Sequence, residues 1–104
     1  MDVTQFRQIP TVAPQWSAAV RALWYEAQGD WTTAHDQVQD DNSADGAWVH
    51  AYLHRVEGDQ FNAAYWYRRA GQAVPAKNLA LGDEWTQLVQ ALVKEYIDAD
   101  CRNH

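Results

Sequence analysis

The sequence has little of what marks secreted, membrane-spanning or disulfide-bonded proteins. Its 104 residues include a single cysteine, Cys101, so no disulfide can form within the chain. No apolar run approaches the roughly 20 residues that a membrane-spanning helix needs. The first 14 residues also lack the apolar segment of a signal peptide. We therefore expect a protein of the reducing cytoplasm that does not insert into a membrane.

Basic residues are also scarce. The chain has 8 lysines and arginines against 14 aspartates and glutamates, which gives a net charge of −6. Because nucleic acids and anionic membranes are bound through clustered basic side chains, we expect neither as the main partner. Hydrophobic residues make up 47% of the chain and charged residues 21%, which is typical of one globular domain with its own core.

Three prolines and five glycines are few, and several of them stand where helices are expected to begin or end. Pro10 and Pro14 predict that residues 1–14 form an extended arm, with Pro14 in the first turn of the first helix. The arm is expected to pack three apolar side chains onto the body: Phe6, Ile9 and Val12.

The apolar residues of the rest of the chain recur at three- and four-residue spacing. This periodicity predicts five helices, at 15–28, 31–39, 47–57, 60–70 and 83–98. Glycines are expected to end the first, third and fourth helices, at Gly29, Gly58 and Gly71. Aspartates are expected to cap the second, third and fourth, at Asp30, Asp45 and Asp59. No segment alternates with a period of two. The predicted fold class is all-α, with one domain at 15–99 and a polar tail at 100–104.

An internal repeat supports this reading. Residues 22–30 (ALWYEAQGD) align with residues 51–59 (AYLHRVEGD) at a shift of 29, and Ala34 then aligns with Ala63. Each copy predicts two antiparallel helices joined by a Gly–Asp turn, with small residues that let the two backbones approach closely.

The repeat resembles the tetratricopeptide superfamily, whose units combine small and aromatic residues at fixed positions around a central glycine. The first unit matches that pattern at Ala22, Tyr25, Gly29, Trp31 and Ala34. The second unit matches it at Ala51, Gly58, Ala63, Tyr67, Ala70 and Pro75. Residues 63–70 (AAYWYRRA) are similar to the second helix of the Sel-type branch, which reads A-x-x-W-Y-R-[KR]-A.

The resemblance covers residues 15–75 and implies protein or peptide binding, with the last helix covering the open end of the stack. The chain departs from the family in its period of 29 rather than 34, and in Arg21, His50 and His54, which replace expected Leu and Tyr. The stretch 48–55 (WVHAYLHR) is also similar to one found in small bacterial proteins, a likeness that implies no activity.

The resemblance places Trp48, Tyr52 and Arg55 on the face of the first helices that lines the groove of such repeats. Trp, Tyr and Arg are the residue types enriched in binding hot spots. The alternative is that the arm or the last helix fills this groove. Two further candidates, Arg68 and Arg69, are expected to meet the acidic loop at 40–45.

The preferred function is therefore a non-enzymatic interaction module with no cofactor and no catalytic residue. Its expected partner is a protein or peptide. A second copy of the chain is an alternative partner, bound through exposed faces of Trp16 or Trp85.

The alternative function is metal binding or small metal-dependent catalysis. His50 and His54 are four residues apart on one helix, so both imidazoles share a face and can reach one ion. A third ligand would have to be His35, Asp36 or Glu57. The competing and favoured interpretation is that both imidazoles are partly buried and hydrogen-bonded to neighbours such as tyrosine hydroxyls.

Two other segments are set aside. Residues 65–69 combine aromatic and basic side chains, but on a helix these point in different directions and cannot form one nucleic-acid platform. The acidic loop at 40–46 lacks the ligand spacing of a calcium loop, whose twelfth position is Ala51 here.

Overall fold

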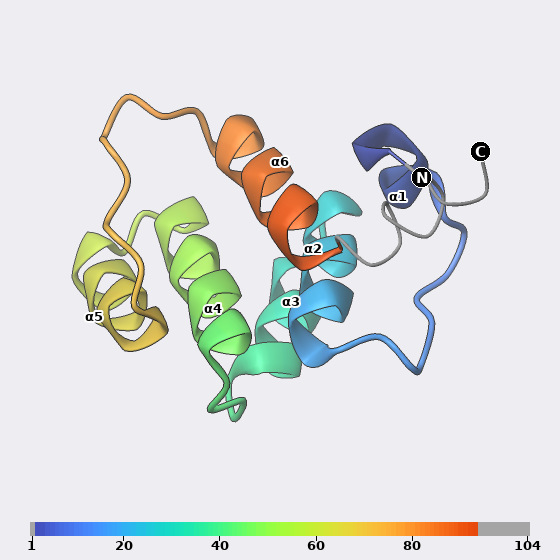
Figure 1. Ribbon diagram of the computed structural model, residues 1–104, viewed down its shortest axis with the longest axis horizontal. Helices are drawn as coiled ribbons and strands as arrows, with labels where there is room; N and C mark the ends of the chain where they lie inside the picture. Colours follow the sequence, from blue (N-terminus) through green and yellow to red (C-terminus); the bar gives the residue numbers. More distant parts are fainter. Residues whose placement is uncertain (1, 94–104) are drawn as a thin grey trace.

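The computed structural model describes residues 2–93 (Figure 1). This part of the chain contains six helices: α1 (Val3–Gln8), α2 (Ala18–Ala27), α3 (Trp31–Val38), α4 (Ala44–Val56), α5 (Gln60–Ala70) and α6 (Leu81–Leu92). No strand occurs within it. The predicted all-α class is confirmed.

Two helical hairpins, α2–α3 and α4–α5, form the centre of the molecule. Gly29 and Gly58 follow the first helix of each, with φ of +83° and +86°, a conformation that costs glycine little. Asp30 and Asp59 then cap the second helices, each accepting a hydrogen bond of 3.1 Å from the backbone N–H three residues on. The two Gly–Asp turns therefore have the predicted role and nearly the same geometry.

Alanines lie where the helices meet. Ala22 and Ala34 in the first hairpin and Ala51 and Ala63 in the second are all buried. Since an alanine side chain occupies little space, the paired backbones can approach closely. This confirms that the small residues of the repeat face the interior.

The interior consists of two unequal clusters. The main core joins buried side chains of α1, α2, α3, α4 and α6. The α4–α5 core is much smaller, with Ala51, Ala63 and Tyr67 at its centre. Trp48 is half-buried and packs against both clusters. The second hairpin therefore meets the rest of the molecule mainly through α4.

Helix α6 lies across α2 and α4, the first helices of the two hairpins, and also packs on α1 (Figure 1). Its Trp85 is 1% exposed, and the indole Nε1–H donates a hydrogen bond of 3.0 Å to the carbonyl of Leu23 in α2. The last helix, which was expected to cover the open end of the stack, thus covers the face formed by α2 and α4 instead. Among the described helices, α5 packs only on α4.

The N-terminal arm differs from the prediction, because residues 3–8 form the short helix α1. Asp2 and Gln5 make a capping box: the Asp2 carboxylate accepts from the Gln5 N–H, and the Gln5 side chain accepts from the Asp2 N–H. The predicted packing is nevertheless confirmed. Phe6 is buried against Trp16 and Trp85, and Ile9 and Val12 pack on the same core.

Helix ends also differ where a serine competes with the predicted residue. The Ser17 hydroxyl caps α2, so Pro14 lies outside the helix rather than in its first turn. The Ser43 hydroxyl caps α4 in place of Asp45, which becomes part of the first turn. Helix α6 begins at Leu81, and the predicted continuation to residue 98, the polar tail and Cys101 lie outside the described residues.

The helices in the described part of the chain are short and carry polar faces. None of those within residues 2–93 is long and apolar enough to cross a lipid bilayer.

Candidate functional site

Helix α6 covers the face on which the groove residues were predicted. Tyr52 is 2% exposed, and its hydroxyl donates a hydrogen bond of 3.4 Å to Oε2 of Glu26 in α2. Burial raises the pKa of the Tyr52 hydroxyl above its usual value, and burial also raises the pKa of Glu26. Tyr52 is therefore part of the interior, as expected if the last helix fills the groove.

Arg55 belongs to a buried polar network beneath the start of α6. Its Nη1 forms an ion pair of 2.8 Å with Oε1 of Glu84, and both side chains are less than a tenth exposed. Its Nη2 donates to the carbonyl oxygen of Leu79. The Tyr67 hydroxyl donates to the other Glu84 oxygen, Oε2. Every polar partner in this network is matched, as burial of a charged pair requires.

The network joins the two hairpins to α6. Burial, followed by the hydrogen bond to Glu84, raises the pKa of the Tyr67 hydroxyl, which stays protonated and able to donate. Since Tyr67 comes from α5, Arg55 from α4 and Glu84 from α6, one carboxylate holds three helices together. Arg55 and Tyr67 are therefore structural donors rather than exposed binding groups.

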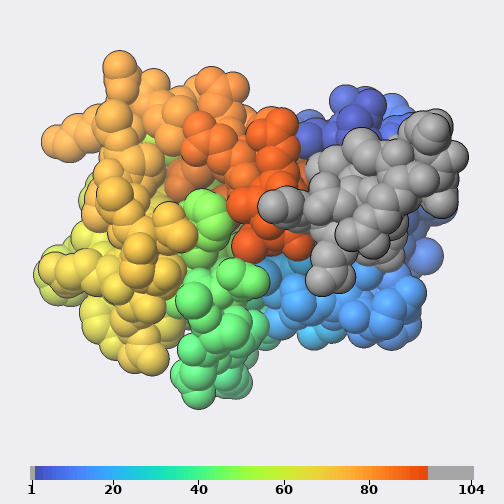
Figure 2. All heavy atoms as spheres, viewed as in Figure 1, coloured from blue at the N-terminus to red at the C-terminus, as the bar shows by residue number. Residues whose placement is uncertain are grey.

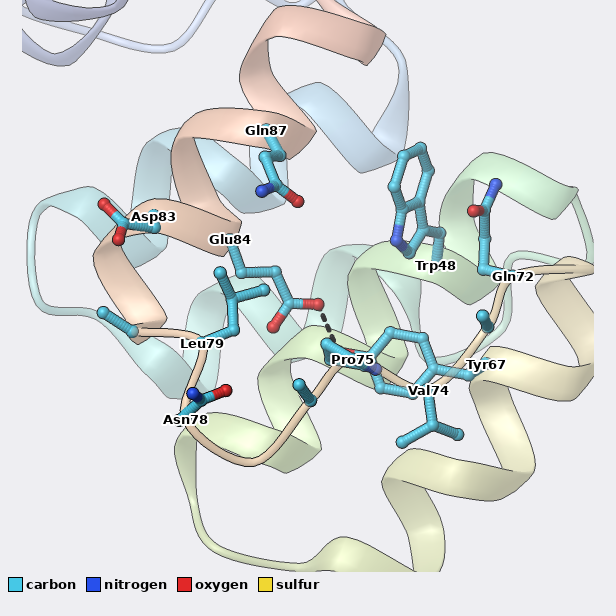
Figure 3. Close-up of a pocket in the computed structure, with 13 residues that line it drawn as sticks. Trp48, Tyr67, Gln72, Val74, Pro75, Asn78, Leu79, Asp83, Glu84 and Gln87 are labelled. Atoms are coloured by element: carbon cyan, nitrogen blue, oxygen red, sulfur yellow. Dashed lines mark hydrogen bonds between the residues drawn. The ribbon is translucent and has the colours of Figure 1, made fainter.

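A pocket of about 610 Å³ opens beside this network (Figure 3). Trp48 of α4 and Tyr67 of α5 lie on one side, and Glu84 and Gln87 of α6 lie on the other. Residues 72–76 and 78–80, from the connection between α5 and α6, form its rim. In the space-filling view, green atoms of α4 are recessed between this connection and α6 (Figure 2).

The rim of the pocket offers both apolar and backbone polar groups. Val74 is 51% exposed, and Pro75 and Leu79 are half-buried beside it. Residues 72–76 form no helix or strand. Among the backbone hydrogen bonds of the described residues outside the helices, none involves the N–H of Ala73 or of Val74. An extended segment of another chain can therefore pair with this rim.

Arg68 and Arg69 are exposed on α5. The Arg69 guanidinium lies over the rings of Tyr65 and Trp66, at 5.8 and 5.2 Å, and donates a hydrogen bond of 3.1 Å to the Tyr65 hydroxyl. No ion pair within residues 2–93 joins either arginine to the acidic loop at 40–45, where they were expected to pair.

Aromatic residues 65–67 point in different directions, as predicted. Tyr65 is exposed, Trp66 is half-buried against His50, and Tyr67 is buried toward Glu84. The three rings do not form one stacking surface.

Trp16 and Trp85, which were expected to offer exposed faces to a second copy, are both buried in the main core. Within one chain neither indole therefore offers the exposed face on which that alternative depended. The sequence pattern placed both indoles on apolar helix faces that a second chain was expected to contact. In the structure Phe6 of α1 packs against both rings.

The structure brings His35 of α3 together with His50 and His54 of α4. One potential ligand nitrogen from each lies within 4.8 Å of the others. The Nε2 atoms of His35 and His50 are 3.1 Å apart and share a hydrogen bond, so His50 has a hydrogen-bonded neighbour as the favoured interpretation expected, although that neighbour is an imidazole and not a tyrosine hydroxyl. Of the three alternatives for a third ligand, His35 is the one that completes this cluster. Glu57 contacts His54 instead, with 2.6 Å between Nδ1 and Oε1.

Burial favours the neutral form of two members of the cluster, His35 and His50. It lowers the pKa of His50 to about 4, with the neighbouring His35 and His54 as further causes. The pKa of His35 is also lowered, mainly by burial. Both imidazoles are therefore neutral at pH 7, and their ring nitrogens include unprotonated lone pairs.

Sequence reasoning missed Glu84 and the connection 72–80 as parts of the pocket. The one local signal was a charged residue, Arg55, on the face of α4 that carries Trp48 and Tyr52. A buried arginine needs an acidic partner, but the chain has 14 aspartates and glutamates, and the sequence does not indicate which of them pairs with Arg55.

Comparisons with models of protein families, with curated proteins and with solved structures find no match for this chain. The likeness to tetratricopeptide repeats therefore rests on the residues of the two hairpins alone.

Proposed function

We propose that this chain is a non-enzymatic protein-interaction module of the cytoplasm, and that its repeat belongs to the tetratricopeptide-like class. The observation that carries the proposal is the pocket between α4, α6 and the connection 72–80. It combines the Trp48 indole with exposed apolar groups and with the N–H groups of Ala73 and Val74, which have no backbone hydrogen-bond partner within residues 2–93. Such a combination suits an extended peptide with one apolar anchor.

Charge favours a basic peptide. The chain has a net charge of −6, and the exposed Asp83 lies at the edge of the pocket. Acidic surfaces attract basic segments over roughly 10 Å at 0.1 M salt, so binding should weaken as salt is added.

The walls of the pocket are well fixed. Tyr67 is bound to Glu84, and Glu84 is bound to Arg55, so these wall residues are already held in place when a peptide arrives. A preformed site loses less entropy on binding than a flexible one. Of the predicted groove residues, Trp48 therefore lines the proposed site, Arg55 is bound to the pocket residue Glu84, and Tyr52 is bound to Glu26 of α2 instead.

A displayed library of random peptides, selected against the purified protein, tests this proposal. We expect enrichment of peptides with one large apolar residue flanked by Lys or Arg. The affinity of the best peptide should fall about 10-fold or more in the Val74→Glu variant, because a charge then replaces an apolar contact in the rim.

Phe61→Glu is the matched control, because Phe61 is 84% exposed on α5 and does not line the pocket. This variant should bind the same peptides with unchanged affinity. If the selected peptides are insensitive to Val74→Glu, or respond equally to Phe61→Glu, the pocket is not the binding site and the proposal is wrong.

A further inference from the structure

The strongest unassigned constellation is the histidine cluster between the two hairpins, which lies outside the pocket. His35 faces His50 and His54 where α3 packs on α4. His50 is 4% exposed, and the side chain of His54 is 12% exposed. The chain has four histidines, and three of them meet at this one helix interface. Two of these three imidazoles are nearly enclosed.

The spacing of His35 and His50 fits a shared metal ion. Zinc–nitrogen bonds are about 2.0–2.1 Å long, so two nitrogens on one tetrahedral ion lie about 3.3–3.4 Å apart. The observed Nε2–Nε2 distance is 3.1 Å. This contact is a hydrogen bond between the two rings, so zinc binding requires a displacement of a few tenths of an ångström and transfer of the bridging proton to the other nitrogen of its ring.

Each of these two rings is oriented by an indole. The Trp31 ring stacks on His35 with a centroid distance of 4.9 Å and an interplanar angle of 10°. The Trp66 ring stacks on His50 at 4.0 Å and 18°. No hydrogen-bond partner within residues 2–93 contacts Nδ1 of His50, so stacking and the contact at Nε2 orient this ring. Rings held in place by packing lose little freedom when they bind an ion.

His54 has the contact typical of a metal-ligating histidine. Its Nδ1 lies 2.6 Å from Oε1 of Glu57, so in the Nδ1–H tautomer the ring donates a hydrogen bond to this carboxylate and Nε2 is the nitrogen left to bind an ion. The His54 ring is nearly parallel to that of His50, with a centroid distance of 4.9 Å and an interplanar angle of 22°. A potential ligand nitrogen of His54 lies within 4.8 Å of those of His35 and His50.

We propose that His35, His50 and His54 form a binding site for one Zn²⁺ ion, with Glu57 as the carboxylate that orients His54. Neutral imidazoles suit zinc, whereas Mg²⁺ and Ca²⁺ require oxygen ligands that this cluster does not provide. Three protein ligands leave the fourth position of the ion to water or another small ligand. Because the ion bridges α3 and α4, its binding also links the first hairpin to the second.

The experiment is a titration of the full-length chain, purified without a histidine tag, with Zn²⁺ followed by calorimetry. All proteins carry Cys101→Ser, because a thiol outside the described residues is itself a zinc ligand. We expect about one equivalent of Zn²⁺ per chain. The ion should raise the melting temperature, since it binds the folded state.

His54→Gln tests the site with the least effect on folding, because His54 is the most exposed member of the α4 pair. This variant and His35→Gln should each bind zinc at least about 10-fold more weakly. Glu57→Gln should bind it about 10-fold more weakly, because His54 is then no longer oriented by a carboxylate. His104→Gln, at the fourth histidine of the chain, is the matched control and should bind as the parent does.

Binding of less than about a tenth of an equivalent would overturn the proposal, because a genuine zinc site binds tightly. So would zinc binding that His54→Gln and His35→Gln leave unchanged in folded protein, as judged by circular dichroism. If a variant fails to fold, Co²⁺ bound to the parent decides instead: visible bands of four-coordinate cobalt support the site, and the spectrum of six-coordinate cobalt contradicts it.

Discussion

The two hairpins have the same turn but different surroundings. Both turns use a left-handed glycine followed by a capping aspartate. In each turn the glycine N–H donates to the carbonyl three residues earlier, that of Glu26 or of Arg55. Yet α3 packs on both α2 and α4, whereas α5 packs only on α4 among the described helices. The first hairpin lies inside the main core, and the second forms one end of the molecule (Figure 1).

The difference shows that the repeat specifies the structure of each hairpin but not which other helices pack against it. A repeat unit buries one face against its neighbour, and a third unit would normally cover the second one. Here α6 packs on α2 and α4 and leaves the outer face of α5 without a described partner. Tyr67 compensates in part, because its hydroxyl reaches Glu84 of α6. The following changes test how far stability depends on this division, from the largest expected effect to the smallest.

Trp85→Ala should cause the largest loss. The indole is fully buried in the main core, contacts Phe6 and donates to the Leu23 carbonyl, so truncation removes apolar burial, leaves a cavity and frees a buried acceptor. We expect the free energy of unfolding to fall by about 3–5 kcal/mol. Urea denaturation followed by circular dichroism measures it. A loss below about 1 kcal/mol would mean that α6 is not an integral part of the main core.

Glu84→Gln should cost less and should act on the second hairpin. The amide keeps the shape of the carboxylate but leaves the buried Arg55 guanidinium without its counter-charge. We expect a loss of about 2–3 kcal/mol, since hydrogen bonds to charged groups are worth that much. Tyr67→Phe, which leaves the ion pair intact, should cost about 1 kcal/mol.

Hydrogen exchange locates the effect of both changes. Because Tyr67 is the one side chain of α5 that bonds to α6 in the described network, amides of α5 should exchange faster in Tyr67→Phe than amides of α3. Uniform acceleration in α3 and α5 would show that the two hairpins unfold as one unit.

Gly29→Ala and Gly58→Ala compare the turns directly. Both glycines have positive φ, and a Cβ at either position would meet no atom within 4 Å, so the cost arises from the backbone alone. We expect a similar loss of about 1–2 kcal/mol for each. The unfolding free energies of the two variants in urea provide the measurement. A difference above about 1 kcal/mol would show that the turns are not equivalent.

Local features of the fold could be predicted from the sequence. Gly29, Gly58, Asp30 and Asp59 act within a few residues of their own position, so the repeat alone predicts two hairpins with matching turns. Helix α1 was missed because Pro10 and Pro14 suggested extended chain, although Asp2 and the glutamine three residues later are a capping-box pattern.

Features that depend on docking could not be predicted in the same way. Arg55 and Glu84 are 29 residues apart in the chain, and their pairing depends on where α6 lies. His50 and His54 share a helix face by spacing alone. That His35 joins them, rather than Asp36, depends on how α3 rotates against α4. Propensity and periodicity predict elements, whereas such contacts follow from the packing of whole helices.

Phe61→Thr should have the smallest effect. Phe61 is 84% exposed, and the residue 29 positions earlier in the first hairpin is Thr32, so the change makes the two units alike at an exposed position. We expect the free energy of unfolding to change by less than about 0.5 kcal/mol, because the ring buries almost nothing in the single chain. Unfolding in urea should be measured at two protein concentrations. If the variant is less stable than the parent, and the deficit grows with concentration, a second copy covers α5 in solution and the contrast between the hairpins does not hold there.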